Sequence, residues 1–193
     1  MTEASYDPYA PNSDSTVPVN TRTSINGKVT IVDYDPAWPE MYRREEARIR
    51  GALGERALLV EHIGSTAVPG LPAKPCIDIM LAVKDSADEP AYVPDLEAAG
   101  YVLRIREPDW HEHRVFKGRE INLNLHVWTI DDPELKRHRD FRDWLRLHKD
   151  DRDRYAEAKR SLGSETWSTM QDYAEAKNDI VAEIQGRIRK AQE

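Results

Sequence analysis

Residues 76–83 (CIDIMLAV) are apolar except for one carboxylate, Asp78. A short apolar run of this kind is typical of a strand that is buried on both faces inside a sheet. A carboxylate in such a strand costs several kcal/mol unless it is paired, bound to a metal or open to a cleft. The run therefore predicts a central strand whose Asp78 side chain faces a functional cleft.

The other apolar spacings predict a mixed α/β domain followed by helices. We expect helices from Pro36 to about Gly54 and over residues 90–99. From Pro133 onward there is no strand pattern, and apolar residues at helical intervals predict two or three helices. Further strands are expected at residues 28–32, 57–63, 101–106, 114–117 and 121–129.

The fold class that follows is α/β or α+β, in three segments. Residues 28–130 are expected to form the core, and residues 131–193 a C-terminal helical cap. Residues 1–27 are rich in Ser, Thr, Asn, Pro and Asp without periodicity. We expect them to form a disordered tail.

The amino-acid composition limits the classes of partner that the protein can bind. The chain has 28 basic and 35 acidic residues and a net charge of -7, without the basic footprint of a protein that binds long nucleic acid. A local basic pocket for a small phosphorylated ligand remains compatible with this balance. No apolar run approaches the ~18 residues of a membrane span, and the N-terminus lacks the apolar stretch of a secretory signal. We expect a cytoplasmic protein with no membrane partner, and the oligomeric state is left open.

The segment Gly64-Ser65-Thr66 follows an expected strand. Glycine permits a sharp turn whose backbone N–H groups can hold phosphate oxygens, with the Ser65 and Thr66 hydroxyls as further donors. A bare Gly-Ser pair is also common in structural turns. Lys74 lies between this turn and Asp78, where it could reach a bound anion. The hypothesis is a phosphate site next to Asp78.

Polar residues alternate with apolar ones in the last expected strand. Asn122, Asn124 and His126 therefore share one face. This face is either the solvated side of the sheet or the lining of the same cleft, with His126 as a base or metal ligand and Asn124 as its hydrogen-bonding neighbour. His111 and His113 have the spacing of metal ligands, but two histidines in an exposed turn are more often simply polar surface.

Side chains four residues apart in the C-terminal helices share a helical face. In each pair the side chains could simply pack in the core or lie on the solvated surface. Alternatively, the Lys or Arg side chains could contact the phosphates of a ligand. The pairs are Tyr155 with Lys159, Tyr173 with Lys177, and Arg142 with Arg146.

Residues 62–79 (HIGSTAVPGLPAKPCIDI) resemble the signature of the GrpB family. The resemblance continues through residues 122–127, 141–146 (FRDWLR) and 155–159 (YAEAK), and it spans most of the chain after residue 28. Members of this family occur alone or fused to dephospho-CoA kinase, and the family is placed in the nucleotidyltransferase superfamily. The resemblance implies a nucleotidyltransferase-like mixed sheet with flanking helices and a C-terminal helical cap.

The superfamily resemblance also implies a chemistry. A Gly-Ser motif holds a triphosphate, an Asp-x-Asp/Glu pair holds a divalent metal such as Mg²⁺, and a third acid activates the acceptor hydroxyl. This sequence departs from that pattern at two places. Met80 stands at the second acid, and Asn124 and His126 stand where the third acid is expected.

Three functions remain as hypotheses. The leading one is an enzyme that transfers a nucleotidyl or phosphoryl group from a nucleoside triphosphate to a small polar acceptor. Met80 favours a second, a nucleotide- or CoA-type binding module without catalysis, and a third is a metal-dependent hydrolase that uses Asp78, His126 and His113. The candidate site comprises Asp78 as metal ligand and catalytic residue, His126 as catalytic base, and Gly64, Ser65, Thr66, Lys74, Asn124, Arg142, Tyr155 and Lys159 as substrate or phosphate contacts.

Overall fold

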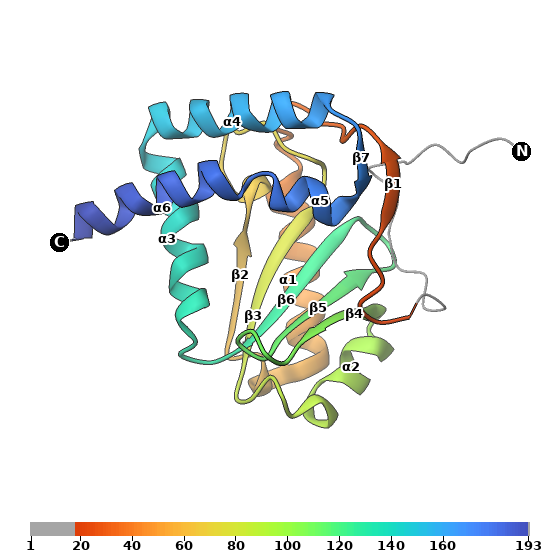
Figure 1. Cartoon of the computed structure of the whole chain (residues 1–193). Coiled ribbons are helices and arrows are strands. Elements are labelled where there is room, and N and C mark those ends of the chain that lie inside the picture. Colours follow the sequence, from red (N-terminus) through yellow and green to blue (C-terminus); the bar gives the residue numbers. More distant parts are fainter. Residues whose placement is uncertain (1–17, 193) are drawn as a thin grey trace, which may run out of the picture.

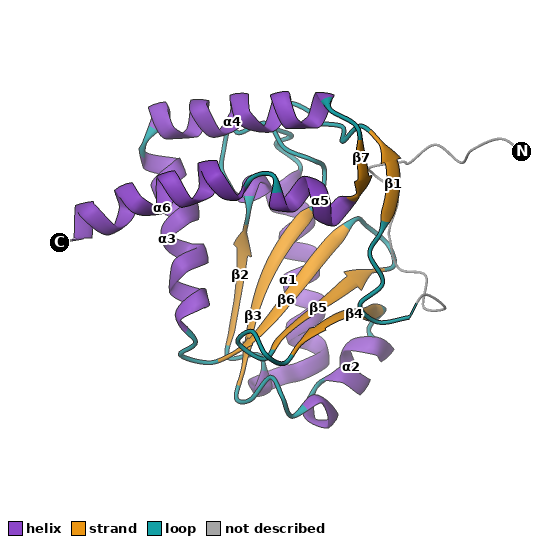
Figure 2. Cartoon of the chain, viewed as in Figure 1, coloured by secondary structure: helices purple, strands orange, loops and turns teal. Residues whose placement is uncertain are grey.

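A five-stranded mixed sheet forms the centre of the computed structural model, which describes residues 18–192 (Figures 1 and 2). The strand order is β2-β3-β6-β5-β4, with β3 and β6 parallel and the other neighbours antiparallel. The predicted mixed α/β class and the interior position of the strand with Asp78 are therefore confirmed. The strands are β2 (Leu59–Ile63), β3 (Ile77–Val83), β4 (Tyr101–Glu107), β5 (His113–Gly118) and β6 (Leu123–Thr129).

One face of the sheet is covered by α1 (Trp38–Leu53) and α2 (Val93–Ala98), which lie behind it in Figure 1. Alternate residues of β3 and β6 point to this side, so the residues between them, including Asp78, point to the other. The apolar core on the covered face includes Ile49, Leu53, Ile77, Ile79, Leu81, Leu96, Leu123, Leu125 and Val127.

The C-terminal helices lie across one end of the opposite face (Figure 1). They are α3 (Pro133–Leu147), α4 (Lys149–Ser164), α5 (Met170–Glu175) and α6 (Asn178–Gln192). Their apolar side chains pack together with Val68 and Leu71, which follow the Gly-Ser turn. The loop after this turn therefore anchors the helices against the sheet.

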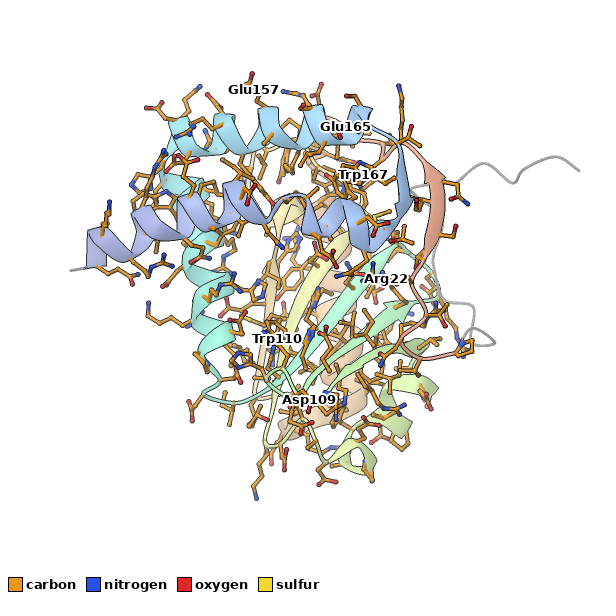
Figure 3. All side chains as sticks on the ribbon, viewed as in Figure 1. Arg22, Asp109, Trp110, Glu157, Glu165 and Trp167 are labelled. Carbon is orange, nitrogen blue, oxygen red and sulfur yellow. The ribbon has the colours of Figure 1, made fainter. Side chains whose placement is uncertain are left out.

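Two segments differ from the sequence predictions by forming a small second sheet. β1 (Ser24–Gly27) pairs antiparallel with β7 (Trp167–Thr169). The expected tail is therefore wrong for residues 24–27, and residues 1–17 lie outside the described residues. Trp167, expected on a helix, lies in β7 (Figure 3). Ile25 stabilises the pairing by packing with Val29 and Tyr173. These contacts could not be predicted, because a strand of three or four residues is too short to show a periodic pattern in the sequence.

Residues 28–32 are also not the regular strand that was expected. The Val29 N–H donates to Gly163 O at 3.2 Å, and Val32 forms an isolated bridge with Ala73. This segment therefore passes between α4 and the loop before β3 without joining the sheet. Over residues 90–99, a 3₁₀ turn (Glu89–Ala91) precedes α2. Within residues 18–192, no helix combines the length and apolarity needed to cross a membrane.

Candidate functional site

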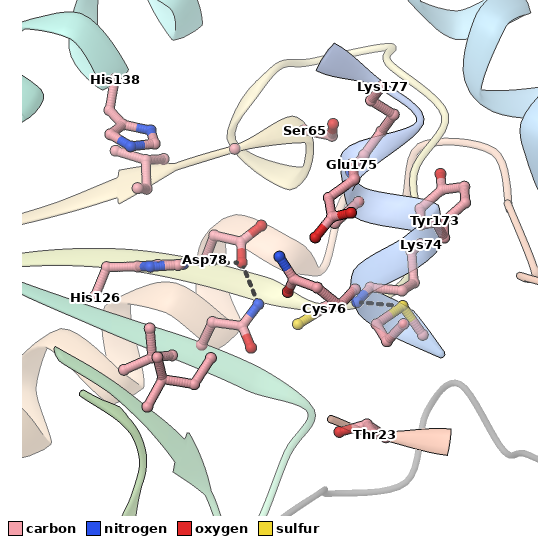
Figure 4. A pocket seen from close by; sticks show the side chains of 18 of the residues that line it. Thr23, Ser65, Lys74, Cys76, Asp78, His126, His138, Tyr173, Glu175 and Lys177 are labelled. Carbon is pink, nitrogen blue, oxygen red and sulfur yellow. Dashed lines mark hydrogen bonds and ion pairs between the residues drawn. The ribbon is translucent and has the colours of Figure 1, made fainter. Parts of the chain in front are cut away.

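A cleft of about 780 Å³ lies between the polar face of the sheet and the C-terminal helices (Figure 4). Strands β3, β4, β5 and β6 form one wall, helices α3, α4, α5 and the start of α6 form another, and residues 20–23 close a third side. The cleft brings together nearly all of the residues selected from the sequence: Gly64, Ser65, Thr66, Lys74, Asp78, Asn124, His126, Tyr155 and Lys159.

Strand register places the polar residues of β3, β5 and β6 beside one another. Asp78 is opposite Asn124, and Asn124 is opposite Lys117. The Asn124 amide donates to Asp78 Oδ1 at 2.6 Å, and Lys117 Nζ donates to Asn124 Oδ1. Asn122 was expected on the same face, but it precedes β6 and its amide donates to Pro75 O at 3.1 Å. It supports the loop before β3 instead.

Asp78 carries a negative charge at the floor of the cleft. Its side chain is 27% exposed, and His126 Nε2 lies 3.7 Å from its Oδ1. Burial alone would raise the pKa of this carboxyl, but hydrogen bonding to His126 and Asn124 and the charge of Lys74 outweigh burial and hold the pKa below its usual range. The site therefore contains a stable anion surrounded by donors and cations.

A chain of hydrogen bonds orients His126. Glu107 Oε2 lies 2.7 Å from His113 Nδ1, and His113 Nε2 lies 3.0 Å from His126 Nδ1. Burial lowers the pKa of His113 to about 4 although Glu107 opposes the shift, so this ring is neutral at pH 7. Its Nδ1–H donates to Glu107, and its Nε2 accepts from His126 Nδ1–H. The Nδ1 side of the His126 ring is thus held by His113, which directs Nε2 toward Asp78 and the cleft.

His111 and His113 do not form the metal pair that their spacing suggested. Backbone φ angles of 57° at His111 and 45° at Glu112 turn the chain between them. His111 Nδ1 lies 3.1 Å from Asp132 Oδ2, whereas both ring nitrogens of His113 are already hydrogen-bonded. His113 thus has no lone pair left for a metal, which removes the ligand set of the hydrolase hypothesis.

The Gly-Ser turn meets Asp78 directly. Gly64 has φ 69°, and a Cβ atom at this position would lie 2.5 Å from Asp78 Oδ2. Ser65 Oγ accepts from Lys159 Nζ at 2.9 Å and hydrogen-bonds with the Tyr155 hydroxyl. Ser65 is thus held at the cleft wall by two residues of α4, next to the carboxylate.

Thr66 was expected to donate to phosphate, and here the structure corrects the prediction. Its side chain is buried, with the residue only 1% exposed. Its hydroxyl donates to Cys76 O at 3.3 Å and lies 2.9 Å from His62 Nε2. Both interactions tie the turn to neighbouring strands, so this hydroxyl serves the fold.

Lys159 is buried rather than on a solvated helix surface, with only 2% of the residue exposed. Besides Ser65, its Nζ donates to Pro72 O and lies 4.7 Å from the centre of the Tyr155 ring. Burial, and then the charge of Lys177, lowers the pKa of Lys159 well below its usual value. A bound anion would offset both effects, because it favours the protonated amine.

The charge of the cleft is opposite to that of the chain. Among the described residues that line it, eight are Lys or Arg and three are carboxylates, whereas the whole chain carries -7. Arg22, Arg106 and Arg137 are paired with Asp172, Glu89 and Glu134, so the excess of positive charge comes chiefly from the lysines, and it favours anions in the cleft. The cations are Arg22, Lys74, Arg104, Arg106, Lys117, Arg137, Lys159 and Lys177, and the carboxylates are Asp78, Glu107 and Glu175.

Arg142 and Arg146 do not line the cleft, contrary to the prediction. Arg142 Nη1 donates to Glu61 Oε2 at 2.7 Å, and the same guanidinium bonds Asp143. Arg146 donates twice to Ala67 O, at 3.0 and 2.8 Å. Both side chains fasten α3 to β2 and to the Gly-Ser turn, and so they position the turn rather than a ligand.

The donor set fits one metal ion bound together with a substrate. Within residues 18–192, no group of three or more His, Cys, Asp and Glu side chains is arranged around a common point. Met80 is 0% exposed in a small apolar cluster with Ile63 and Trp128, so the second acid of a two-metal site is missing. Mg²⁺ is commonly held by one carboxylate and the phosphates of a substrate, and Asp78 can supply that carboxylate.

Comparison with known proteins identifies the family. Residues 28–187 match the family model described as GrpB protein. The chain belongs to the GrpB family. UPF0157 protein BH1888 from Halalkalibacterium halodurans is 57% identical over 162 residues, which cover 84% of this chain and 83% of that protein. A dephospho-CoA kinase from Mycolicibacterium paratuberculosis is 33% identical over 173 residues, which cover 74% of this chain and 42% of that protein.

The fold is shared with a solved member of the GrpB family. The crystal structure of conserved protein GrpB from Enterococcus faecalis has a TM-score of 0.75 and 29% sequence identity. The superposition covers 85% of this chain and 100% of the Enterococcus faecalis chain. The resemblance that the signature residues suggested is therefore confirmed for family and fold.

Sequence reasoning missed several residues of the cleft in this GrpB-family protein, among them Glu107, Lys117, His138 and Gln185. Glu107 and Lys117 contribute through strand register, which pairs Glu107 with His113 and Lys117 with Asn124. His138 and Gln185 lie on helices whose packing brings them to the cleft. The regular spacing from Lys177 through residue 181 to Gln185 is the one signal that could have indicated a shared helical face.

Proposed function

We propose that this protein binds a nucleoside triphosphate in the cleft and transfers a nucleotidyl or phosphoryl group from it to a small polar acceptor. The reversal of charge in the cleft carries the proposal. Three of its lysines contact neutral groups: Lys117 an amide oxygen, Lys159 a hydroxyl and a carbonyl, and Lys177 the Tyr173 ring. A polyphosphate would relieve the repulsion between them.

Asp78 and His126 supply the chemistry in this proposal. The acceptor oxygen attacks a phosphorus of the nucleotide, and the bond from that phosphorus to the leaving phosphate breaks. The proton of the acceptor hydroxyl passes to His126 Nε2, and Asp78, 3.7 Å away, stabilises the resulting imidazolium. Lysines of the cleft neutralise the leaving group. Mg²⁺ held by Asp78 and the substrate phosphates would stabilise the charge that develops on phosphoryl oxygens.

A binding module without catalysis is the second candidate. Met80, buried in an apolar cluster, favours it because one acid of the usual metal-binding pair is lost. The relative named dephospho-CoA kinase suggests CoA or its precursors as ligands of such a module, since these molecules also carry an adenine nucleotide with several phosphates.

Ligand binding and turnover, measured on the same preparations, separate these functions. Thermal midpoints are compared with ATP, GTP, CTP, UTP, CoA and dephospho-CoA, each with and without Mg²⁺. A ligand at ~100 times its dissociation constant should stabilise the fold by about 2.7 kcal/mol. If none of these ligands raises the midpoint, the proposal is wrong.

Asp78→Asn tests the catalytic step. With a pool of small hydroxyl acceptors, release of pyrophosphate or nucleoside diphosphate is expected from the wild type and is expected to be lost in this variant. Asp33→Asn is the matched control, because the Asp33 side chain is 92% exposed and pairs with Arg160 at the surface. Binding without turnover in the wild type would favour the binding module.

A further inference from the structure

Three side chains follow one another along the wall that α6 contributes to the cleft. Lys177, Val181 and Gln185 are four residues apart and all line it. The Val181 N–H donates to Lys177 O at 3.0 Å, so the helical turn already includes Lys177. Each step of four residues rises about 6 Å along the helix. The wall therefore changes from cationic to apolar to amide over about 12 Å.

Gln185 is a largely buried residue whose amide faces the cleft. The residue is only 8% exposed, yet within residues 18–192 its side chain forms no hydrogen bond. Within the described residues, its amide atoms are not among the fully buried unpaired ones, so they remain open to the cleft. Because Gln185 lines the cleft, a bound molecule can supply the missing partners.

Phe141 of α3 adds an aromatic surface at the same end of the cleft. It packs with Val181 and the other apolar residues that join α3, α4 and α6. Its ring is 5.5 Å from the Tyr155 ring in a T-shaped arrangement, and the Tyr155 hydroxyl bonds Ser65. The aromatic surface therefore lies one side chain away from the Gly-Ser turn.

We propose that this end of the cleft binds the nucleobase of the ligand, with Phe141 and Val181 contacting its faces and Gln185 its polar edge. Every nucleobase presents a hydrogen-bond donor next to an acceptor, and a carboxamide pairs with both at once. The order along α6 matches the order within a nucleotide, in which the phosphates and the base lie at opposite ends. This inference rests on the proposed function and adds the residue that recognises the polar edge of the base.

Dissociation constants for ATP, GTP, CTP, UTP and inorganic tripolyphosphate test the inference. The wild type should bind at least one nucleotide about tenfold more tightly than tripolyphosphate. Gln185→Leu keeps the size of the side chain and should reduce this preference to about twofold or less, with tripolyphosphate affinity unchanged. Gln192→Leu is the matched control, because Gln192 lies on the same helix outside the cleft and bonds Lys136 and Asp140.

Phe141→Leu provides a second variant that removes the ring but keeps the site apolar, and it should also weaken nucleotides but not tripolyphosphate. Thermal midpoints of both variants establish that they are folded. If the wild type binds tripolyphosphate and all four nucleotides with equal affinity, the proposed base site is wrong, whereas the proposed phosphate site is supported. Failure of tripolyphosphate and every nucleotide to bind would overturn the proposed function and this inference together.

Discussion

Position 64 requires glycine for two reasons: its backbone conformation and the closeness of the Asp78 side chain. Its φ of 69° disfavours other residues, and an added Cβ would meet Asp78 Oδ2 at 2.5 Å. The carboxylate would have to move away from Asn124, which donates to its other oxygen. The glycine of the Gly-Ser turn thus makes room for the charge at the floor of the cleft.

We expect Gly64→Ala to lower the free energy of unfolding by about 2 kcal/mol, because backbone strain adds to the clash with Asp78. Gly51→Ala in α1 is the control: its Cβ would have no atom within 4 Å, and we expect a gain of about 0.5–1 kcal/mol. Urea denaturation of both variants measures the two effects. A Gly64→Ala variant as stable as the wild type would show that Asp78 is not packed against this turn.

Lys177 should make the affinity of the cleft for a polyphosphate depend on pH. Burial, and then the charge of Lys74, lowers the pKa of Lys177 to about 8. A bound polyphosphate favours the charged amine and raises that pKa, so above about pH 8 binding requires uptake of a proton. Tripolyphosphate affinity should therefore fall by up to about tenfold between pH 8 and pH 9.

Lys177→Arg separates this effect from other titrations, because arginine keeps its charge throughout this range. Calorimetric titrations at several pH values should give a flatter profile for this variant than for the wild type. Profiles of equal slope would assign the pH dependence to another group.

At the scale of elements, predictability followed the length of each regular segment. The seven residues of β3 and of β6 show which side chains are buried, and so the sequence placed Asp78, Asn124 and His126 on one cleft. β1 and β7 have four and three residues, too few for a periodic pattern, and their partners are far apart in the chain. Lys117 could not be placed because its position depends on the register between β5 and β6.

The β1–β7 pair matters because α5 follows β7 directly. Thr169 caps α5, and Arg22, just before β1, donates to Asp172 of α5 at 3.1 Å. Lys74 Nζ in turn lies 3.5 Å from Met170 Sδ at the start of α5 (Figure 4). The small sheet thus supports one wall of the cleft.

Ile25→Ala should destabilise the protein by about 2–3 kcal/mol, because it opens a cavity between β1, Val29 and Tyr173. Leu58→Ala is the control, because Leu58 is largely exposed and its truncation should cost about 0.5 kcal/mol or less. Thermal unfolding measures the loss of stability in each of the two variants. Equal small losses would mean that β1 is not part of the folded core.

At the scale of the whole molecule, the account rests on one contrast of charge. The chain carries -7, yet in the described lining of its cleft cations outnumber carboxylates eight to three, around an ionised Asp78. The fold separates the charges by tying many surface arginines to carboxylates, as Arg50 is tied to Glu46 and Arg142 to Glu61. Composition alone does not reveal this separation, because interleaved charges of both signs fill the sequence.

The dissociation constant of ATP for Lys74→Ala, compared with Lys84→Ala, tests this central claim most directly. Lys74 precedes β3 and lines the cleft, whereas Lys84 follows β3 at its far end and is exposed outside it. Both variants remove one positive charge, so the net charge of the molecule changes equally. We predict that calorimetric titration gives about tenfold weaker binding for Lys74→Ala and wild-type affinity for Lys84→Ala. Equal affinities of the two variants would contradict the placement of a phosphate site in this cleft.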